Sequence, residues 1–370
     1  MMVIFSSLSP LLNRVICIII LVLIGVVYVL QWIFSRGSRN SFDHKIDSQG
    51  HRRAPELLAK DLLSRPLAAN SGVIPKLIHQ SWSTQDLPSK FSTWSHSCRE
   101  QNPDWEWVLW TDEDNLNLVK KYCPLLLPYY RQLRGEIYRA DLVRNLYMYI
   151  YGGMYADLDV ECLRPANELF EFYNVNTVPH HSSYEAPHMS SKQMKAFFGR
   201  MGTDDHFEHS IPNAWMASTP KHPFFLLPLE SAVDKLSGNG DGISPESFTG
   251  PVALWDAINV YFDEYSGTGE LEQRLHKNST LQGIFEPEYK MKHSIEILPF
   301  WNVFPYSWWR DGDAFRSTCS INSAEYDGEK CKLIIAADRW GSYFITYWSH
   351  SWNWEGHEKS HIKNIEKRLY

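Results

Sequence analysis

The chain has 370 residues, of which 44% are hydrophobic and 14% aromatic, and its formal net charge is −7 at pH 7. Such a chain has enough apolar residues for one large hydrophobic core or two small ones. Its negative charge leaves no basic surface of the kind that binds phosphate backbones, so we expect no nucleic-acid partner.

The first distinctive segment is an apolar run at residues 15–34, which contains no charged residue. It is long enough to cross a bilayer as a helix. No small-residue cleavage site follows it closely, so after a short tail (1–14) we expect a transmembrane anchor rather than a removed signal peptide. Arg14 precedes the run, whereas five basic residues follow it by residue 53, and the positive-inside rule would keep that second set in the cytoplasm.

Residues 35–72 are polar and rich in turn formers, so we expect a stem with one short helical pattern at 56–63. Thr111 and Asp114 have the spacing of a helix N-terminal cap. Strands alternating with helices predict an α/β fold with a largely parallel sheet, whose ligands bind at the carboxyl ends of the strands. The pattern predicts strands at 76–80 and 105–110 and helices near 125–133, 136–151, 224–236 and 252–265.

The helix predicted over residues 136–151 carries charged residues away from its apolar stripe. At about 100° per residue, Leu142, Val143 and Leu146 lie on one side, and Asp141 and Arg144 lie on roughly the opposite side. These two are three residues apart and can pair. A solvated ion pair on an ordinary amphipathic helix is one interpretation. The other is a guanidinium that helps to neutralise a diphosphate leaving group.

Two aspartates follow a glycine pair just after this helix. In an extended strand over 155–160, Asp157 and Asp159 would point the same way because side chains alternate along a strand. Two carboxylates on one side suit Mg²⁺ or Mn²⁺, which keep positions open for substrate phosphates. The alternative is that both carboxylates only cap a loop.

Four stretches of this chain resemble the sugar-binding Asp-x-Asp region of family-32 glycosyltransferases, which include fungal inositol-phosphoceramide mannosyltransferases and initiating α-1,6-mannosyltransferases of the Golgi. They are 74–82, 107–112, 139–144 (Arg-Ala-Asp-Leu-Val-Arg) and 151–159 (Tyr-Gly-Gly-Met-Tyr-Ala-Asp-Leu-Asp). The resemblance implies the nucleotide-sugar fold called GT-A for a catalytic domain over residues 73–370, in the Golgi lumen. Because a large C-terminal domain can be translocated despite flanking charge, we expect the lumenal orientation.

The resemblance also implies the activity. The expected enzyme is a metal-dependent retaining glycosyltransferase that moves a hexose, with mannose from GDP-mannose as the expected donor, to a hydroxyl of a glycan, a glycolipid or a small molecule. Mn²⁺ or Mg²⁺ would stabilise the departing nucleoside diphosphate, so charge stabilisation would supply most of the barrier reduction. The last residues of the chain are polar, whereas the inositol-phosphoceramide enzymes carry additional apolar spans there.

Each expected site residue has a role in this scheme. Asp157 and Asp159 are the expected metal ligands, with His350 as a third because imidazole binds Mn²⁺ well. By resemblance, Asp141 and Arg144 hold hydroxyls of the donor sugar. The remaining expected donor-binding residues are Gln80, Trp82, Asp112, Tyr155, Ser351 and Trp352. Core packing is the alternative for Trp82, and helix capping is the alternative for Asp112.

Two other functions fit part of the pattern. In an Asp-x-Asp phosphatase or phosphotransferase the first aspartate attacks phosphorus. Such enzymes want an apolar buried strand directly before the pair, where this chain has Gly152 and Gly153. A non-catalytic membrane-tethered sugar-binding protein is the other alternative, and it would bind sugar without binding a nucleotide.

Three further features bear on compartment and acceptor. The triplet Asn278-Ser279-Thr280 fits an N-glycosylation acceptor. Cys319 and Cys331 flank a short polar loop, which suits either a disulfide or two buried thiols. A cluster of Trp301, Trp308 and Trp309 would either face an acceptor or pack in the core.

Overall fold

The computed structural model describes residues 53–67, 72–180, 193–204, 206–238, 242–265, 270–281, 284, 292–349 and 362–369. The chain divides into two units, Met1–His44 and Lys45–Tyr370, and every described residue belongs to the second. The predicted tail and the anchor at 15–34 therefore lie outside the described residues. Within the described ranges, no helix has the length and apolar character needed to cross a bilayer.

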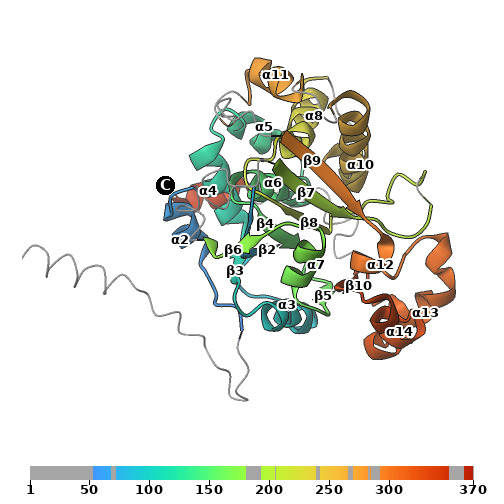
Figure 1. Ribbon diagram of the computed structural model, residues 1–370. Coiled ribbons are helices and arrows are strands. Elements are labelled where there is room, and N and C mark those ends of the chain that lie inside the picture. Colours follow the sequence, from blue (N-terminus) through green and yellow to red (C-terminus); the bar gives the residue numbers. More distant parts are fainter. Residues whose placement is uncertain are drawn as a thin grey trace, which may run out of the picture. The chain divides into compact units, whose positions relative to one another are not determined.

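A six-stranded sheet forms the centre of the second unit, in the order β3-β2-β4-β8-β7-β9 (Figure 1). β2 (Leu77–Ser81) pairs in parallel with β3 (Glu106–Trp110) and β4 (Gly153–Ala156). β7 (Gln193–Gly199) pairs in parallel with β9 (Lys292–Leu298). β8 (Trp215–Ser218) lies between β4 and β7 and runs antiparallel to both. The α/β fold is confirmed, with a mixed sheet in which five of the six strands run in one direction.

Two small sheets flank this one. β1 (Ile74–Pro75) pairs in parallel with β6 (Thr177–Val178). β5 (Val160–Cys162) pairs antiparallel with β10 (Phe344–Thr346). The second pair matters for the site, because it brings the C-terminal part of the chain next to the segment that follows the Asp-x-Asp residues.

Helices cover both faces of the central sheet. Since side chains alternate along a strand, neighbours such as Leu77 and Ile78 enter different hydrophobic cores. α4 (Asp112–Tyr122), α6 (Glu136–Ile150), α8 (Leu226–Ser237) and α10 (Pro251–Val260) contribute to one core. α3 (Ser89–Gln101) and α7 (Ala166–Phe172) contribute to the other.

The other described helices are short. They are α2 (Ala59–Ser64), α5 (Leu127–Gln132), α9 (Pro245–Phe248), α11 (Glu270–Lys277), α12 (Phe300–Val303), α13 (Arg316–Cys319), α14 (Gly328–Ile334), α15 (Ala337–Trp340) and α16 (Ile362–Leu369), with 3-10 turns η2 (Pro223–Phe225) and η4 (Arg310–Phe315) and a π-helical turn η3 (Tyr261–Tyr265). The strands predicted at 76–80 and 105–110 are confirmed as β2 and β3, and the four predicted helices as α5, α6, α8 and α10. The described part of the predicted stem, 53–67, packs on the sheet, with Leu57 N donating to Trp107 O at 2.8 Å.

α6 is the helix that carries the charged residues of the candidate site. From Leu142 to Ile150 every residue is buried, and so are Arg139 and Asp141. The interpretation of a solvated ion pair on an amphipathic helix is therefore wrong. A helix that is buried on most sides can carry charges only when they are paired, and those of α6 are paired with each other and with the chain around them.

Two disulfides link elements of the second unit. Cys98 in α3 joins Cys162 in β5, and Cys319 joins Cys331. The sequence left the second bridge open and did not indicate the first. Cys123 is a free buried thiol, and burial raises its pKa to about 12. The Cys98–Cys162 bridge fixes β5 just beyond the Asp-x-Asp residues.

Candidate active site

Asp157 and Asp159 lie in a turn between β4 and β5. The Asp157 backbone donates to Ala214 O at 2.8 Å, and Val160 N donates back to Asp157 O at 3.1 Å. The prediction of one extended strand over 155–160 is therefore wrong. β4 ends at Ala156, which pairs with Trp215 at the start of β8, and the chain must turn there to reach its next partner, β10.

Asp157 faces Arg144 in the middle of α6. Its Oδ1 accepts from the Tyr155 hydroxyl at 2.5 Å and lies 3.3 Å from Arg144 Nη1. A third of its side chain remains exposed. Burial raises the pKa of Asp157 to about 6, and Asp159 adds to the rise while Arg144 opposes it. Asp157 is therefore a carboxylate that is held in place and still reachable from solvent.

Arg144 joins the buried side of this arrangement. Its Nη2 lies 2.9 Å from Asp141 Oδ1, its Nη1 donates to Asn213 O at 2.8 Å, and its guanidinium lies 4.7 Å from the Tyr155 ring centre. Burial opposes its charge, but Tyr155, Asp157 and Asp141 together hold its pKa above the usual value. The guanidinium is thus committed to protein partners on several sides.

Asp141 is almost fully buried and is oriented from two directions. Besides Arg144, the Asn213 side-chain amide donates to its Oδ1 at 3.0 Å. Burial raises the pKa of Asp141, although Arg144 and Asn213 oppose the rise. Beside Oδ2 lies Gly250, where an added Cβ would come within 3.1 Å of that oxygen. The hydroxyl of neighbouring Thr249 is buried and has no hydrogen-bond partner among the described residues.

Asp159 is fixed from the C-terminal part of the chain. Its Oδ2 accepts from the backbone N–H of Ser349 at 2.8 Å, and only 9% of the residue is exposed. The expected residues His350, Ser351 and Trp352 lie outside the described residues. Ser349, which contacts Asp159, is the last described residue before them.

Gln80 lies behind the turn rather than in an open cleft. It is fully buried, its Oε1 accepts from Ser95 at 2.6 Å and from the Trp107 indole at 2.8 Å, and its amide lies 3.4 Å from Asp157 O. Trp82 follows the end of β2, is half-buried and packs edge-on against Phe91, with ring centres 5.3 Å apart.

Asp112 and Arg139 lie at the ends of neighbouring helices. The capping box of Thr111 and Asp114 is confirmed, and Asp112 is the first residue of α4. Burial raises the pKa of Asp112 to about 7, Glu136 adds to the rise, and Arg139 opposes it. Arg139 donates to Tyr130 O at 3.1 Å and to Glu136 at 2.9 Å, so it stabilises the end of α5.

His79 supports the glycine turn that begins β4. Its Nδ1 accepts from the Trp110 indole at 3.1 Å, so its Nε2 carries the proton and donates to Gly152 O at 3.0 Å. Burial lowers the pKa of His79 to about 4, so the ring is neutral. Sequence reasoning missed His79, Asn213, Thr249 and Ser349. His79 stands in the stretch 74–82 that carries the family resemblance, which was its only signal.

The carboxylates fit a divalent cation in chemistry and in position. Asp157 and Asp159 are hard oxygen ligands on one turn, a donor set that suits Mg²⁺ or Mn²⁺ and leaves positions for phosphate oxygens. Within the described part of the chain, no group of three or more His, Cys, Asp and Glu side chains is arranged to hold a metal. His350, the predicted third ligand, lies outside the described residues.

Comparison with known proteins agrees with this chemistry. Residues 88–176 match the family model described as the glycosyltransferase sugar-binding region containing DXD motif. Inositol phosphoceramide mannosyltransferase 3 of Schizosaccharomyces pombe is 39% identical over 117 residues, or 31% of this chain and 33% of that protein. Mannosyl phosphorylinositol ceramide synthase SUR1 of Saccharomyces cerevisiae is 28% identical over 250 residues, or 65% of this chain and 53% of that protein.

More distant similarities have the same character. Initiation-specific alpha-1,6-mannosyltransferase of Saccharomyces cerevisiae is 28% identical over 103 residues, or 25% of this chain and 21% of that protein. The chain thus spans about a fifth to a half of the length of these curated relatives. A solved structure, PaToxG Glycosyltransferase, covers 74% of this chain and 90% of its own at 16% identity, with a TM-score of 0.36, a level that establishes nothing about the fold.

Proposed function

We propose that the chain, whose residues 88–176 match the glycosyltransferase sugar-binding region containing DXD motif, is a metal-dependent retaining mannosyltransferase that uses GDP-mannose. The observation that carries the proposal is the Asp157 carboxylate, one third exposed, bound to Arg144 and Tyr155 and followed by Asp159 in the same turn. The names of its relatives favour mannose as the sugar. The proposal includes the GT-A fold, which we assign to the second unit.

We assign the metal-binding role to Asp157 and Asp159, with Mn²⁺ or Mg²⁺ as the cation. When bound there, the cation supplies charge to stabilise the diphosphate that departs from the sugar. The Tyr155 hydroxyl and Arg144 hold Oδ1 of Asp157, and we assign Oδ2 to the cation. The Ser349 N–H holds Asp159 in the same way. Each carboxylate is thus oriented before substrate binds, as preorganised electrostatic stabilisation requires.

Arg144 has a positioning role in this scheme. It is nearly buried, and its terminal nitrogens are bound to Asp141, Asn213 O and Asp157. It therefore orients the carboxylates and contributes positive charge from behind them. Asp141 Oδ2 and the Thr249 hydroxyl, which has no hydrogen-bond partner among the described residues, are polar groups beside it, and we assign these two to the donor sugar.

The remaining expected donor residues act around this centre in the proposal. Gln80 holds the backbone of Asp157, and Trp82 offers an aromatic face at the end of β2 to the nucleotide base. Asp112, His350, Ser351 and Trp352 stay predicted donor or metal contacts. Measuring GDP affinity in Trp82→Ala tests the base contact, because loss of stacking weakens nucleotide binding and spares Mn²⁺ binding.

Donor hydrolysis is the direct test of the proposed activity. Purified full-length protein is incubated with GDP-mannose and Mn²⁺, with or without a chelator, and free mannose is measured. We expect chelation to abolish hydrolysis, and Asp157→Asn or Asp159→Asn to lower it about a hundredfold or more. Asp204→Asn is the matched control, because Asp204 is an exposed carboxylate after β7. Full activity in Asp157→Asn or in Asp159→Asn would contradict the metal assignment.

The same preparation separates the alternative functions. A phosphatase would release phosphate from a phosphomonoester and would not depend on GDP-mannose. A sugar-binding protein would bind mannosides in calorimetry and show no heat with GDP plus Mn²⁺. Either result would replace the transferase proposal.

The compartment is part of the proposal. Disulfides persist in oxidising compartments, and the Cys98–Cys162 and Cys319–Cys331 bridges support a position for the second unit outside the cytosol. We therefore assign a lumenal catalytic unit, in the Golgi by analogy with the family, tethered through residues 15–34.

A further inference from the structure

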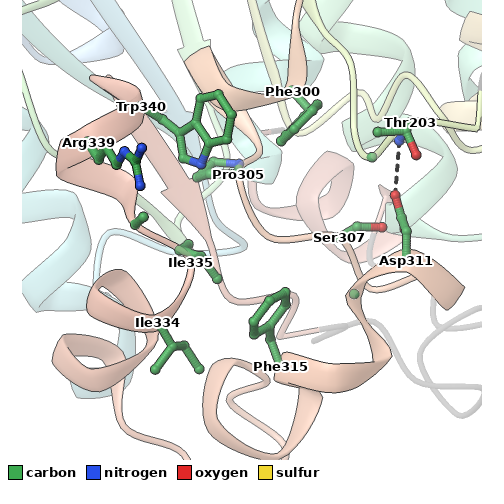
Figure 2. Close-up of a pocket in the computed structure, with 13 residues that line it drawn as sticks. Thr203, Phe300, Pro305, Ser307, Asp311, Phe315, Ile334, Ile335, Arg339 and Trp340 are labelled. Atoms are coloured by element: carbon green, nitrogen blue, oxygen red, sulfur yellow. Dashed lines mark hydrogen bonds between the residues drawn. The ribbon is translucent and has the colours of Figure 1, made fainter.

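The C-terminal helices enclose a cavity that the proposed reaction does not use. Its volume is about 620 Å³, and its walls come from the segment after β7, from 300–315 and from 334–340. Figure 2 shows Arg339, Trp340 and Ile334 along one side of the hollow and Thr203, Ser307 and Asp311 on the other. Asp311 is already committed, because its Oδ2 accepts from Thr203 N at 2.9 Å.

The lining is mainly apolar. Its hydrophobic members are Phe300, Pro305, Phe315, Ile334, Ile335, Ala336 and Trp340. Arg339 is the basic side chain on this lining, and its guanidinium forms no ion pair with any described residue. A cavity of this kind suits a ligand that is largely hydrocarbon and carries a negatively charged group at one end.

The helices that line the cavity, α12, α14 and α15, expose four large apolar side chains to solvent, which we call the rim. Leu333 is 74% exposed, Trp340 52%, Ile334 41% and Trp301 37%. Trp301 stacks on Trp340 with ring centres 5.9 Å apart. Among the described residues, half of the exposed large hydrophobic side chains therefore belong to α12, α14 and α15. Such a concentration is unusual for a surface that faces only water.

The predicted tryptophan cluster is accordingly divided. Trp308 and Trp309 pack with Phe207, whose ring centre lies 4.0 Å from that of Trp309. Trp301 belongs instead to the exposed rim with Trp340. Trp308 and Trp309 are partly buried, whereas Trp301 and Trp340 are exposed.

Chain length allows this face to reach a bilayer. Eighteen residues separate the predicted span at 15–34 from the first described residue, Arg53. A chain of that length extends at most about 60 Å. The second unit would therefore stay within contact range of the membrane that holds the anchor.

We propose that Trp301, Leu333, Ile334 and Trp340 form a membrane-contact surface, and that the cavity beside them takes up one phospholipid. In this arrangement Arg339 binds the lipid phosphate, while an acyl chain lies against Phe300, Phe315 and Ile335. Tryptophan and arginine suit this position because each combines an apolar body with a polar end. The inference uses the proposed anchor to bring the surface to the bilayer, and it does not depend on the transferase activity.

The surface is also coupled to the Asp-x-Asp turn. Between Pro305 and Ser307, which line the cavity, the carbonyl of Tyr306 accepts from the Trp348 indole at 3.1 Å. The next residue, Ser349, donates to Asp159. A bilayer at this face would thus hold the site at a fixed height above the lipid headgroups.

Photolabelling tests the proposal. The full-length protein is reconstituted in phosphatidylcholine vesicles that contain a trace of phosphatidylcholine with a diazirine on its acyl chain, and labelled peptides are mapped by mass spectrometry. We expect label in peptides that contain residues 300–315 and 331–340. Trp340→Asp or Leu333→Asp should lower the labelling of these peptides at least fivefold. Arg339→Glu should lower the labelling of the residues that line the cavity.

Phe172→Asp is the matched control, because Phe172 is 76% exposed on α7, a helix that does not line the cavity. It should leave the labelling of residues 300–340 unchanged. Equal labelling in the rim variants and the wild type, or label spread evenly over the surface, would overturn the proposal. Melting curves of each variant exclude unfolding as a cause. The peptide containing residues 15–34 reports separately on the anchor, and donor hydrolysis in detergent reports separately on the transferase.

Discussion

At the scale of single residues, Arg144 determines the geometry of the candidate site. It contacts Asp141 and Asp157, which come from α6 and from the turn after β4, and it also binds the backbone of Asn213 ahead of β8. A lysine would keep the positive charge, but its compact ammonium cannot reach several acceptors in one plane. Replacing Arg144 with lysine therefore tests whether the site needs only a positive charge or also the planar geometry of the guanidinium.

We expect Arg144→Lys to lower donor hydrolysis about a hundredfold. It should also lower the free energy of unfolding by about 2–3 kcal/mol, because Asp141 would remain buried with an incomplete partner. Kinetics and urea denaturation measure the two effects. Arg164→Lys is the control, since Arg164 is 42% exposed and pairs with the equally exposed Glu168. It should change stability by less than about 1 kcal/mol. Equal effects at both positions would contradict the role of Arg144.

The ionisation of Asp157 predicts how metal binding depends on pH. Burial raises its pKa to about 6, and a protonated carboxyl does not bind a cation. Below that pH, protons therefore compete with the metal. Mn²⁺ affinity should rise about tenfold per pH unit up to about pH 6 and level off above about pH 7. Calorimetric titration of the protein with Mn²⁺ measures this dependence.

Asp112 is the control for that assignment, because its pKa is also raised, to about 7, by burial and by Glu136. In Asp112→Asn the pH dependence of Mn²⁺ affinity should persist unchanged. If it disappears in that variant, the titrating group is Asp112 and the assignment to Asp157 is wrong.

At the scale of elements, the turn between α6 and β4 places the aspartates. Gly152 and Gly153 have positive φ angles of 65° and 91°. A Cβ on Gly153 would lie 2.7 Å from Leu77 O, and one on Gly152 would lie 2.7 Å from Ser218 O. The close approach of β4 to both neighbouring strands therefore requires glycine at both positions.

Gly153→Ala should lower the free energy of unfolding by about 3 kcal/mol, because the alanine adds a clash with β2 to an unfavourable φ. Urea denaturation measures the change. Gly242→Ala is the control, since Gly242 has a φ of 87° but no heavy atom within 4 Å of an added Cβ. It should lose only about 1 kcal/mol. The same loss at both positions would show that backbone strain alone, without crowding, determines the effect.

The elements differ in how far the sequence predicted them. Local patterns predicted α6, β2, β3 and the Thr111 cap, because periodicity and capping depend on residues a few positions apart. The turn at 157–159 could not be predicted in this way. It depends on Ala214 and Ser349, which lie far along the chain and meet Asp157 and Asp159 only after β8 and β10 have paired. The burial of Gln80 and the Cys98–Cys162 bridge could not be predicted for the same reason, because both depend on contacts between residues far apart in the chain.

At the scale of the whole molecule, two features favour an oxidising compartment beside a membrane. The disulfides stabilise the second unit only where thiols are oxidised. The exposed rim of Trp301, Leu333, Ile334 and Trp340 gives that unit a face suited to lipid. The positive residues that follow the predicted span argue for the opposite orientation. A covalent modification acquired only in the lumen distinguishes the lumenal from the cytoplasmic orientation of the second unit.

Asn278 provides this mark, since Asn278-Ser279-Thr280 is the one Asn-x-Ser/Thr triplet of the sequence. It follows α11, with Ser279 exposed. Its Oδ1 accepts from Thr280 N at 3.0 Å, and its Nδ2 donates to Glu230 Oε1 at 3.0 Å. A glycan on Nδ2 replaces one of two N–H groups, so the other can keep the bond to Glu230. We therefore expect Asn278 to carry a glycan when the full chain is expressed in eukaryotic cells.

A downward gel shift after treatment with a peptide N-glycosidase measures this glycan. Asn278→Gln should abolish the shift, whereas Thr280→Ser should retain it because the acceptor triplet is preserved. A wild-type chain that integrates into membranes without any shift would place the second unit in the cytoplasm. The flanking charges would then determine the orientation, and the disulfides would have to form in a reducing compartment, where they rarely persist. Orientation, compartment and covalent structure must therefore agree, and this one residue tests all three together.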